Sequence, residues 1–351
     1  MKRQRRKEQK IYRRRKALRK KRANRRFILN ALPKSERSFE TGKIGSINSR
    51  LLTLNVPHDF STSEALDDVL YFIGKCKAAG VKKRRIIQIN FEKVNNVNAG
   101  ALSLLLSVIQ DLDDLNIRIR GNMPNNMIAR NAFIDSGFLE YVHNEQGLKH
   151  NSKNKIIVKG QHKVDQRRTG MEVKKAMNTV FGNENHLPPL QGALIEMMAN
   201  SLNHAFPAGT ADSSNYYQAF ISNKRWYFSA FHHEASHEVH FSFIDNGVGI
   251  LNTIRKGKFQ KAVDKLSDAD VLRNAFDGKY RSSTKHVERG KGLPTVKRAH
   301  DLKSISNLKV VTNNQLYDFD NQRYTKLTNG FDGTCYFWKL DKQCKYAKIE
   351  D

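Results

Sequence analysis

The chain has 351 residues, enough for two domains of ordinary size, and its net charge of +28 makes it strongly basic. Its three cysteines are scattered and lack C-x-x-C spacing, which excludes a disulfide framework and a zinc site and favours an intracellular, cytoplasmic protein. The longest apolar run, residues 99–109, is shorter than the roughly 18 residues of a membrane span, and no apolar segment follows the basic N-terminus, so we expect no membrane insertion and no secretory signal.

The positive charge is concentrated at the start of the chain. Residues 1–26 hold 16 Lys or Arg against one Glu, with too few apolar residues to build a core. We predict a flexible basic arm over residues 1–40, in which residues 1–26 bind the phosphates of nucleic acid. A solvated tail, or an arm attracted to anionic lipid or to an acidic protein, is the alternative.

Strand-like and helix-like runs alternate over residues 43–151. Strands are expected at 50–56, 85–91 and 117–120, and helices at 63–79, 99–112 and 125–136. This alternation is typical of an α/β layer structure, so we predict a first α/β domain here.

Two motifs give this first domain a family resemblance. The turn Val-Asn-Ala-Gly-Ala-Leu at residues 97–102 and the sequence NAFIDSGF at 131–138 resemble the STAS domain of anti-sigma-factor antagonists and sulfate-transporter tails. That family usually has Asp-Ser-Ser-Gly-Leu at the turn, and its second serine accepts phosphate. Here Ala99 takes that position and has no hydroxyl, so a phosphorylation switch is not expected. Ser103, one helical turn later, is expected in the core or on the helix surface.

Residues 152–170 are polar and basic and are interpreted as a linker, followed by a helix at 171–181. Pro188 and Pro189 then precede the sequence ALIEMMANSLNHAF at 193–206, since proline suits the start of a helix. This helix is apolar nearly all round. It carries one narrow polar stripe, which consists of Glu196, Asn200, Asn203 and His204. Because such groups are costly to bury without partners, the stripe is expected to face a cavity.

Three further motifs follow this helix in order. A strand at 237–244 leads into Asp-Asn-Gly-Val-Gly-Ile at 245–250, after strand-like runs at 216–221 and 225–231. Gly-Lys-Gly-Leu-Pro at 290–294 opens a helix that extends to about residue 300, and Phe-Asp-Gly-Thr at 331–334 begins a last strand. A glycine turn that leads into a helix offers free N–H groups to phosphate oxygens. There is no G-x-x-x-x-G-K-[ST], so this is not a P-loop protein.

The ordered set of motifs, E-x-x-x-N-x-x-x-H, D-N-G-V-G-I, G-K-G-L and G-T-x-x-F, resembles the GHKL or Bergerat-fold ATPases, which include gyrase and the histidine kinases. The resemblance implies that residues 171–345 form an α/β sandwich that binds ATP and Mg²⁺.

The resemblance also assigns roles to single residues. Asp245 would accept a hydrogen bond from the adenine amine, with support from Thr334, and Gly247 and Gly249 would let the adenine and ribose approach. Asn200 would bind Mg²⁺ through its side-chain oxygen, with Asn203 beside it in the nucleotide site. Gly290, Lys291, Gly292 and Leu293 would form the phosphate-binding turn, where Lys291 neutralises charge.

Glu196 decides the chemistry. In this family the glutamate one turn before the metal-binding Asn usually acts as general base towards the γ-phosphate; a structural pairing with Lys or Arg is the alternative. His204 either lies near the phosphates or closes the stripe as a satisfied polar residue. Residues 251–289 correspond to the ATP lid, with a short helix from Asp268 and possible phosphate contacts from Arg281 and residues 282–284.

Three functions remain open at this stage. The leading one is a Mg²⁺-dependent ATP hydrolase whose lid closure repositions the STAS-like domain or the arm. The second is a serine/threonine protein kinase of the anti-sigma-factor type, and the third is an ATP-binding scaffold without turnover. An ATP-dependent homodimer and a protein partner for the STAS-like domain are consistent with each.

Overall fold

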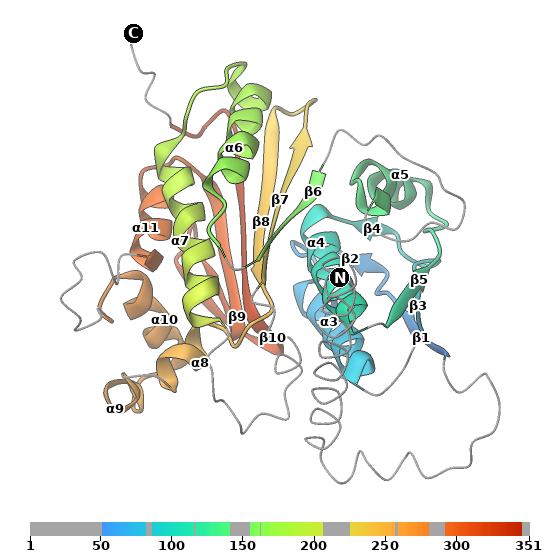
Figure 1. Ribbon diagram of the computed structural model, residues 1–351, viewed down its shortest axis with the longest axis horizontal. Coiled ribbons are helices and arrows are strands. Elements are labelled where there is room, and N and C mark those ends of the chain that lie inside the picture. Colours follow the sequence, from blue (N-terminus) through green and yellow to red (C-terminus); the bar gives the residue numbers. More distant parts are fainter. Residues whose placement is uncertain are drawn as a thin grey trace, which may run out of the picture.

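The computed structural model describes residues 51–81, 86–115, 117–140, 155–161, 163–205, 225–256, 259–280 and 292–345. The predicted basic arm and the predicted strand at 216–221 lie outside these residues. The described part is a mixed α/β structure with two main sheets (Figure 1). None of its helices is long and apolar enough to cross a membrane.

The first sheet contains three parallel strands in the order β1-β3-β5, as the alternating pattern predicted. The strands are β1 (Leu51–Asn55), β3 (Ile86–Asn90) and β5 (Arg118–Gly121). Its helices are α3 (Leu66–Val81), α4 (Ala99–Asp114) and α5 (Met127–Asp135), with a 3-10 turn at Phe138–Glu140. Two short parallel strands, β2 (Asp59–Phe60) and β4 (Asn96–Val97), complete the part of the structure from β1 to the 3-10 turn, which is called the first unit below; the part from β6 onwards is the second unit.

The second sheet contains five antiparallel strands in the order β6-β7-β8-β10-β9. The strands are β6 (Lys155–Gln161), β7 (Arg225–His233), β8 (Glu238–Asp245), β9 (Ser306–Asp318) and β10 (Arg323–Leu340). Figure 1 shows the helices α6 (Gln166–Phe181), α7 (Pro188–His204) and α11 (Gly292–Asp301) on one face of this sheet. Three shorter helices, α8 (Ile250–Arg255), α9 (Gln260–Val263) and α10 (Asp268–Phe276), lie beside α7 and α11.

The predicted linker at 152–170 is wrong. Strand β6 occupies Lys155–Gln161 and pairs with β7 at the edge of the second sheet, and α6 begins at Gln166 rather than at residue 171. The carboxylate of Asp165 caps α6 by accepting from the Arg168 N–H. The second unit therefore starts within residues 152–170, which were predicted to be a linker because they are polar.

The two units share a hydrophobic core. Helices α3 and α4 lie between the two sheets, packing on β10 and β8 as well as on β1 and β5 (Figure 1). The apolar cluster of the first unit extends into the other face of the second sheet. The second-sheet members of this cluster are Tyr227, Ile244, Val311, Leu327, Phe331 and Cys335. The sequence predicted two domains with separate cores, whereas the second sheet is covered by helices on both faces.

The sequence of helix α4 suits a position between the two sheets. Asn98 caps it by accepting from the Ala101 N–H, and every residue from 101 to 109 is buried. An α-helix that is apolar all round needs neighbours all round, and two sheets supply them. Ser103, expected in the core or on the surface, is in the core and hydrogen-bonds the Ser229 hydroxyl of β7 at 2.8 Å.

Because the core is shared, a substitution that destabilises the first unit should also destabilise the second. Leu105→Ala removes a fully buried side chain of α4 and is expected to destabilise the protein by about 2–5 kcal/mol. Both tryptophans, Trp226 and Trp338, belong to the second sheet. Urea unfolding followed by their fluorescence should therefore shift to a lower midpoint.

Ile128→Ala, at a side chain of α5 that is 79% exposed, is the matched control and should leave the midpoint nearly unchanged. A tryptophan transition that is unaffected by Leu105→Ala would mean that the two units unfold independently.

Candidate functional site

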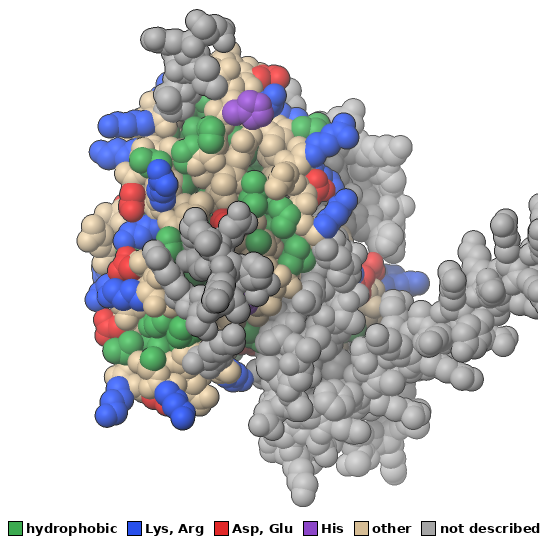
Figure 2. Space-filling view, turned by 60° about the vertical axis from the view of Figure 1, so that its left-hand side comes forward, with side chains coloured by type: hydrophobic (Ala, Val, Ile, Leu, Met, Phe, Trp, Pro, Cys, Tyr) green, Lys and Arg blue, Asp and Glu red, His purple; other side chains and the backbone are tan. Residues whose placement is uncertain are grey.

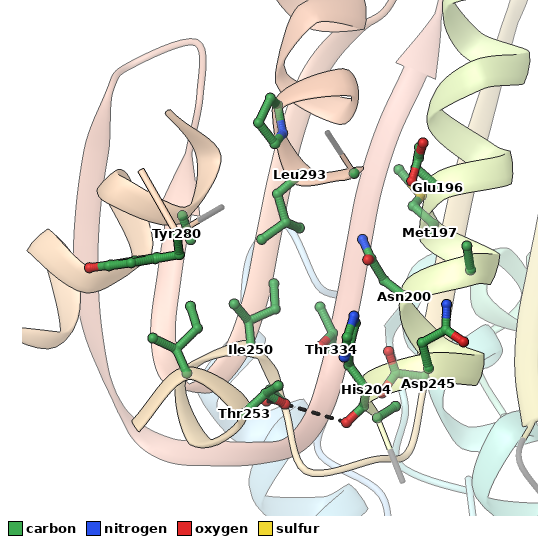
Figure 3. Close-up of a pocket in the computed structure, with 18 of the residues that line it drawn as sticks. Glu196, Met197, Asn200, His204, Asp245, Ile250, Thr253, Tyr280, Leu293 and Thr334 are labelled. Carbon is green, nitrogen blue, oxygen red and sulfur yellow. Dashed lines mark hydrogen bonds between the residues drawn. The ribbon is translucent and has the colours of Figure 1, made fainter. Parts of the chain in front are cut away.

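A cavity of about 680 Å³ opens between α7, the end of β8, the interior of β10, the helices α8 to α10 and the start of α11. In Figure 3, Glu196, Asn200 and His204 project from α7 towards Ile250, Leu293 and Tyr280 on the opposite side. One wall is therefore polar and the other largely apolar. Cavities of this size that combine apolar walls with a few converging polar groups are typical of small-molecule sites.

The polar wall is the stripe of α7. Pro188 and Pro189 occupy the first positions of the helix, where the lack of an N–H costs nothing. The opposite face of the helix is buried against the second unit's core; its members are Leu190, Ala193, Leu194 and Met198. Met197 belongs to the same core and also borders the cavity. The predicted stripe residues Glu196, Asn200, Asn203 and His204 all line the cavity, which confirms that the stripe faces a hollow.

Asn200 carries the clearest sign of an absent partner. Its amide nitrogen is buried and has no hydrogen-bond partner among the described residues. A buried unpaired amide costs about 1–3 kcal/mol, so a bound ligand would recover that cost. A Cβ on Gly292 would lie 2.9 Å from this nitrogen and 3.0 Å from Glu196 Oε2, which places the start of α11 directly against both side chains.

Asp245 ends β8 at the floor of the cavity. Its carboxylate accepts hydrogen bonds from the Gly247 N–H at 3.1 Å and from the Ser201 hydroxyl of α7 at 3.2 Å. Thr334 pairs with it across β8 and β10, as predicted, and also lines the cavity. Burial raises the pKa of the Asp245 carboxyl from 3.8 to about 6, and these hydrogen bonds offset only part of that effect.

The two glycines of the Asp-Asn-Gly-Val-Gly turn differ from each other. Gly249 has a φ of +82°, caps α8 and lines the cavity, as predicted. Gly247 does not line it. A Cβ at Gly247 would clash with the backbone of Ala205 at the end of α7, so its small size is needed for the packing of this helix end. The approach of a ligand to Gly247 stays a prediction.

The predicted phosphate-binding turn is described only in part. Gly292 begins α11 and lines the cavity together with Leu293. Gly290 and Lys291 lie outside the described residues, as do Arg281 and residues 282–284.

The apolar wall was not predicted as part of the site. It includes Ile250 and Ile254 of α8, followed by Phe259 and Tyr280. The i, i+4 spacing of Ile250 and Ile254 was the available signal. The helix predicted from Asp268 is confirmed as α10, and Asp268 holds α8 through an ion pair of 2.6 Å with Arg255.

The described residues contain no group of three or more His, Cys, Asp or Glu side chains placed to hold a metal ion. Comparisons with protein-family models, curated proteins and solved structures found no match for this chain. The site must therefore be interpreted from its own geometry.

Asp245→Asn is expected to stabilise the unliganded protein at pH 7.5 by about 1–3 kcal/mol. Between pH 3.8 and about 6 the folded state keeps a proton that the unfolded chain has released, so ionisation of this carboxyl lowers stability as the pH rises through that window. The amide avoids that loss, and its oxygen can still accept from the Gly247 N–H.

Urea denaturation of both proteins at pH 7.5 measures the gain, and the difference between them should shrink as the pH is lowered towards 4.5. An Asn variant that is less stable than the parent at pH 7.5 would contradict a carboxyl whose pKa is raised by burial.

Proposed function

We propose that the protein binds ATP with Mg²⁺ in this cavity, as a GHKL-type, Bergerat-fold unit whose second sheet is backed by a STAS-like unit. The observation behind the proposal is that residues from separate sequence motifs meet at one cavity. Glu196 and Asn200 of α7, Asp245 at the end of β8 and the first residue of α11 come from three separate motifs and border one cavity. The order of these motifs along the chain is that of the family.

Asp245 supports adenine as the base. A buried carboxylate at the cavity floor accepts a hydrogen bond from the exocyclic amine of adenine, whereas guanine would present a carbonyl oxygen to it. The apolar wall formed by Ile250, Ile254 and Phe259 suits the faces of a purine ring.

The position of Asn200 supports the proposal that the site binds Mg²⁺. Rotation of its amide would present an oxygen, the ligand atom that Mg²⁺ prefers. Since the described residues offer no cluster of metal ligands, the remaining ligands would be phosphate oxygens and water, which is usual for Mg²⁺ in nucleotide sites. The ion would neutralise the charge that develops on the phosphates. The start of α11 and Lys291, a predicted ligand outside the described residues, would hold the same phosphates.

Glu196 supports chemistry at the γ-phosphate. It lies one helical turn before Asn200 on the same stripe, where it could orient a water molecule and accept its proton. We therefore infer a hydrolase that works as a nucleotide-driven conformational switch. Transfer to a protein hydroxyl and ATP binding without turnover are the competing outcomes of the tests below.

Phosphorylation within the same chain gains no support at the STAS-like turn. Ala99 has no hydroxyl, and the nearest serine along α4, Ser103, is 1% exposed and bonded to Ser229. A protein kinase built on this fold would thus act on another molecule.

Nucleic-acid binding by residues 1–26 stays a prediction, because the arm lies outside the described residues. On the face shown in Figure 2, Lys and Arg side chains are spread around the margin and mixed with acidic ones, without one basic patch. The proposed electrostatic contact with nucleic acid rests on the 16 Lys or Arg residues of the arm. A protein partner for the STAS-like unit and an ATP-dependent homodimer are further proposals.

Adenosine, which has no titrating phosphate, should bind through Asp245 in a pH-dependent manner. The carboxylate accepts from the amine more strongly than the neutral acid does, so affinity should fall as the pH drops below about 6, by up to tenfold per unit. Calorimetric titration between pH 5 and pH 8 measures this. Asp245→Asn should bind at least tenfold more weakly at pH 7.5 and lose the pH dependence; a flat profile for the parent protein would exclude Asp245 as the base-reading group.

Glu196→Gln should separate binding from chemistry. The amide keeps the size of the side chain and one acceptor oxygen but cannot take up the proton, so phosphate release should fall about 100-fold or more while Mg·ATP affinity changes little. Labelled γ-phosphate should appear in water for a hydrolase and on protein for a kinase. Phosphate release that survives the substitution would remove Glu196 from the role of base.

A further inference from the structure

The back of the second sheet carries a polar network directly behind the cavity. It joins two helices of the first unit to the two irregular segments that flank Asp245. These are the glycine turn Asn246 to Gly249 after β8 and the bulge Phe331 to Thr334 within β10, which are called the two turns below. Buried polar groups between two apolar layers are costly, so their retention at this place needs a reason.

The first link is Asp111 of α4, which is 2% exposed. Its carboxylate accepts from the Asn246 amide at 2.7 Å and from the Tyr227 hydroxyl at 2.7 Å, and Arg225 lies 3.7 Å away. Asn246 directly follows Asp245, and it also donates to the Ser107 hydroxyl of α4. Through these bonds α4 fixes the first residue of the glycine turn.

The second link is Lys77 of α3, which is 6% exposed. Its ammonium donates to the backbone carbonyl of Asp332 at 3.0 Å and lies 4.2 Å from the centre of the Phe331 ring. The next residue, Gly333, has a φ of +130°, and a Cβ there would clash with the backbone oxygen of Asp245. A shift of this segment would therefore change its contact with the Asp245 backbone and displace that residue.

We infer that Lys77 and Asp111 are positioning residues for the nucleotide site: from behind the sheet, they hold the two turns that aim Asp245 and Thr334 into the cavity. The inference rests on the proposed function for the identity of the ligand. Neither residue lines the cavity, so both act through the turns that they hold. By thermodynamic reciprocity, a nucleotide that needs these turns in place also tightens the packing of the first unit on the second sheet.

Lys77→Met and Asp111→Ala test the inference, with Mg·ATP affinity measured by calorimetry on the full chain at a temperature where tryptophan fluorescence shows each variant folded. Each should weaken binding on the order of tenfold. Lys77→Met is the sharper variant, because an apolar side chain replaces a buried ammonium and the free protein should be as stable as the parent or more so. A residue with a merely structural role would not lose affinity without losing stability.

Matched controls come from the same helices. Lys75→Met removes an exposed lysine of α3, and Asp114→Ala removes the other carboxylate of α4 that pairs with Arg225 but does not contact Asn246. Both should bind Mg·ATP within twofold of the parent. Equal effects of Asp111→Ala and Asp114→Ala, or unchanged affinity in Lys77→Met, would overturn the inference while leaving ATP binding intact. Failure of the parent to bind Mg·ATP would overturn the proposed function, and the inference with it.

Discussion

The covering of the second sheet on both faces is the constraint on which the rest of the structure depends. One face packs on α6, α7 and α11 and the other on α3 and α4, so β7 and β8 are buried along most of their length. Any polar group at the centre of this sheet must find its partner inside the protein. Asp245 finds Ser201 and Gly247 within the second unit. The Asn246 amide nitrogen and the Tyr227 hydroxyl both donate to Asp111 of α4, which connects the sheet behind the cavity to the first unit.

At Asp245, burial in the doubly covered sheet lowers the stability of the free protein and also favours a ligand. A carboxyl in the interior is harder to ionise, which lowers the stability of the unliganded protein near neutral pH. A ligand that donates a hydrogen bond to the carboxylate offsets that loss, and the unpaired amide of Asn200 offers a second place for compensation. Both groups border the same cavity, so these two unfavourable features of the free protein lie where a nucleotide would relieve them.

Periodicity in the sequence predicted the elements that position the site. The 3.6-residue period of α7 separated Glu196, Asn200 and His204 from the apolar face, and alternating strands and helices predicted the first sheet. Strand β6 was missed because its short apolar run lies among polar and basic residues. The packing of Gly247 against Ala205 was not predicted, because a glycine motif does not distinguish approach by a ligand from approach by a helix end.

The partners that join the two units could not be predicted. Lys77 and Asp332 are 255 residues apart, and Asp111 and Asn246 are 135 apart. In the sequence, Lys77 is one basic residue among many and Asp111 is one acidic residue near the end of an apolar helix. Only the packing of one unit on the other shows that they meet the two turns beside Asp245.

A crystal structure of the full chain with Mg²⁺ and a non-hydrolysable ATP analogue tests the central claim most directly. We expect the adenine amine within hydrogen-bond distance of the Asp245 carboxylate, Mg²⁺ bound by the side chain of Asn200, and the γ-phosphate beside Glu196 and the start of α11. A nucleotide bound elsewhere, or a base that leaves Asp245 without contact, would contradict it.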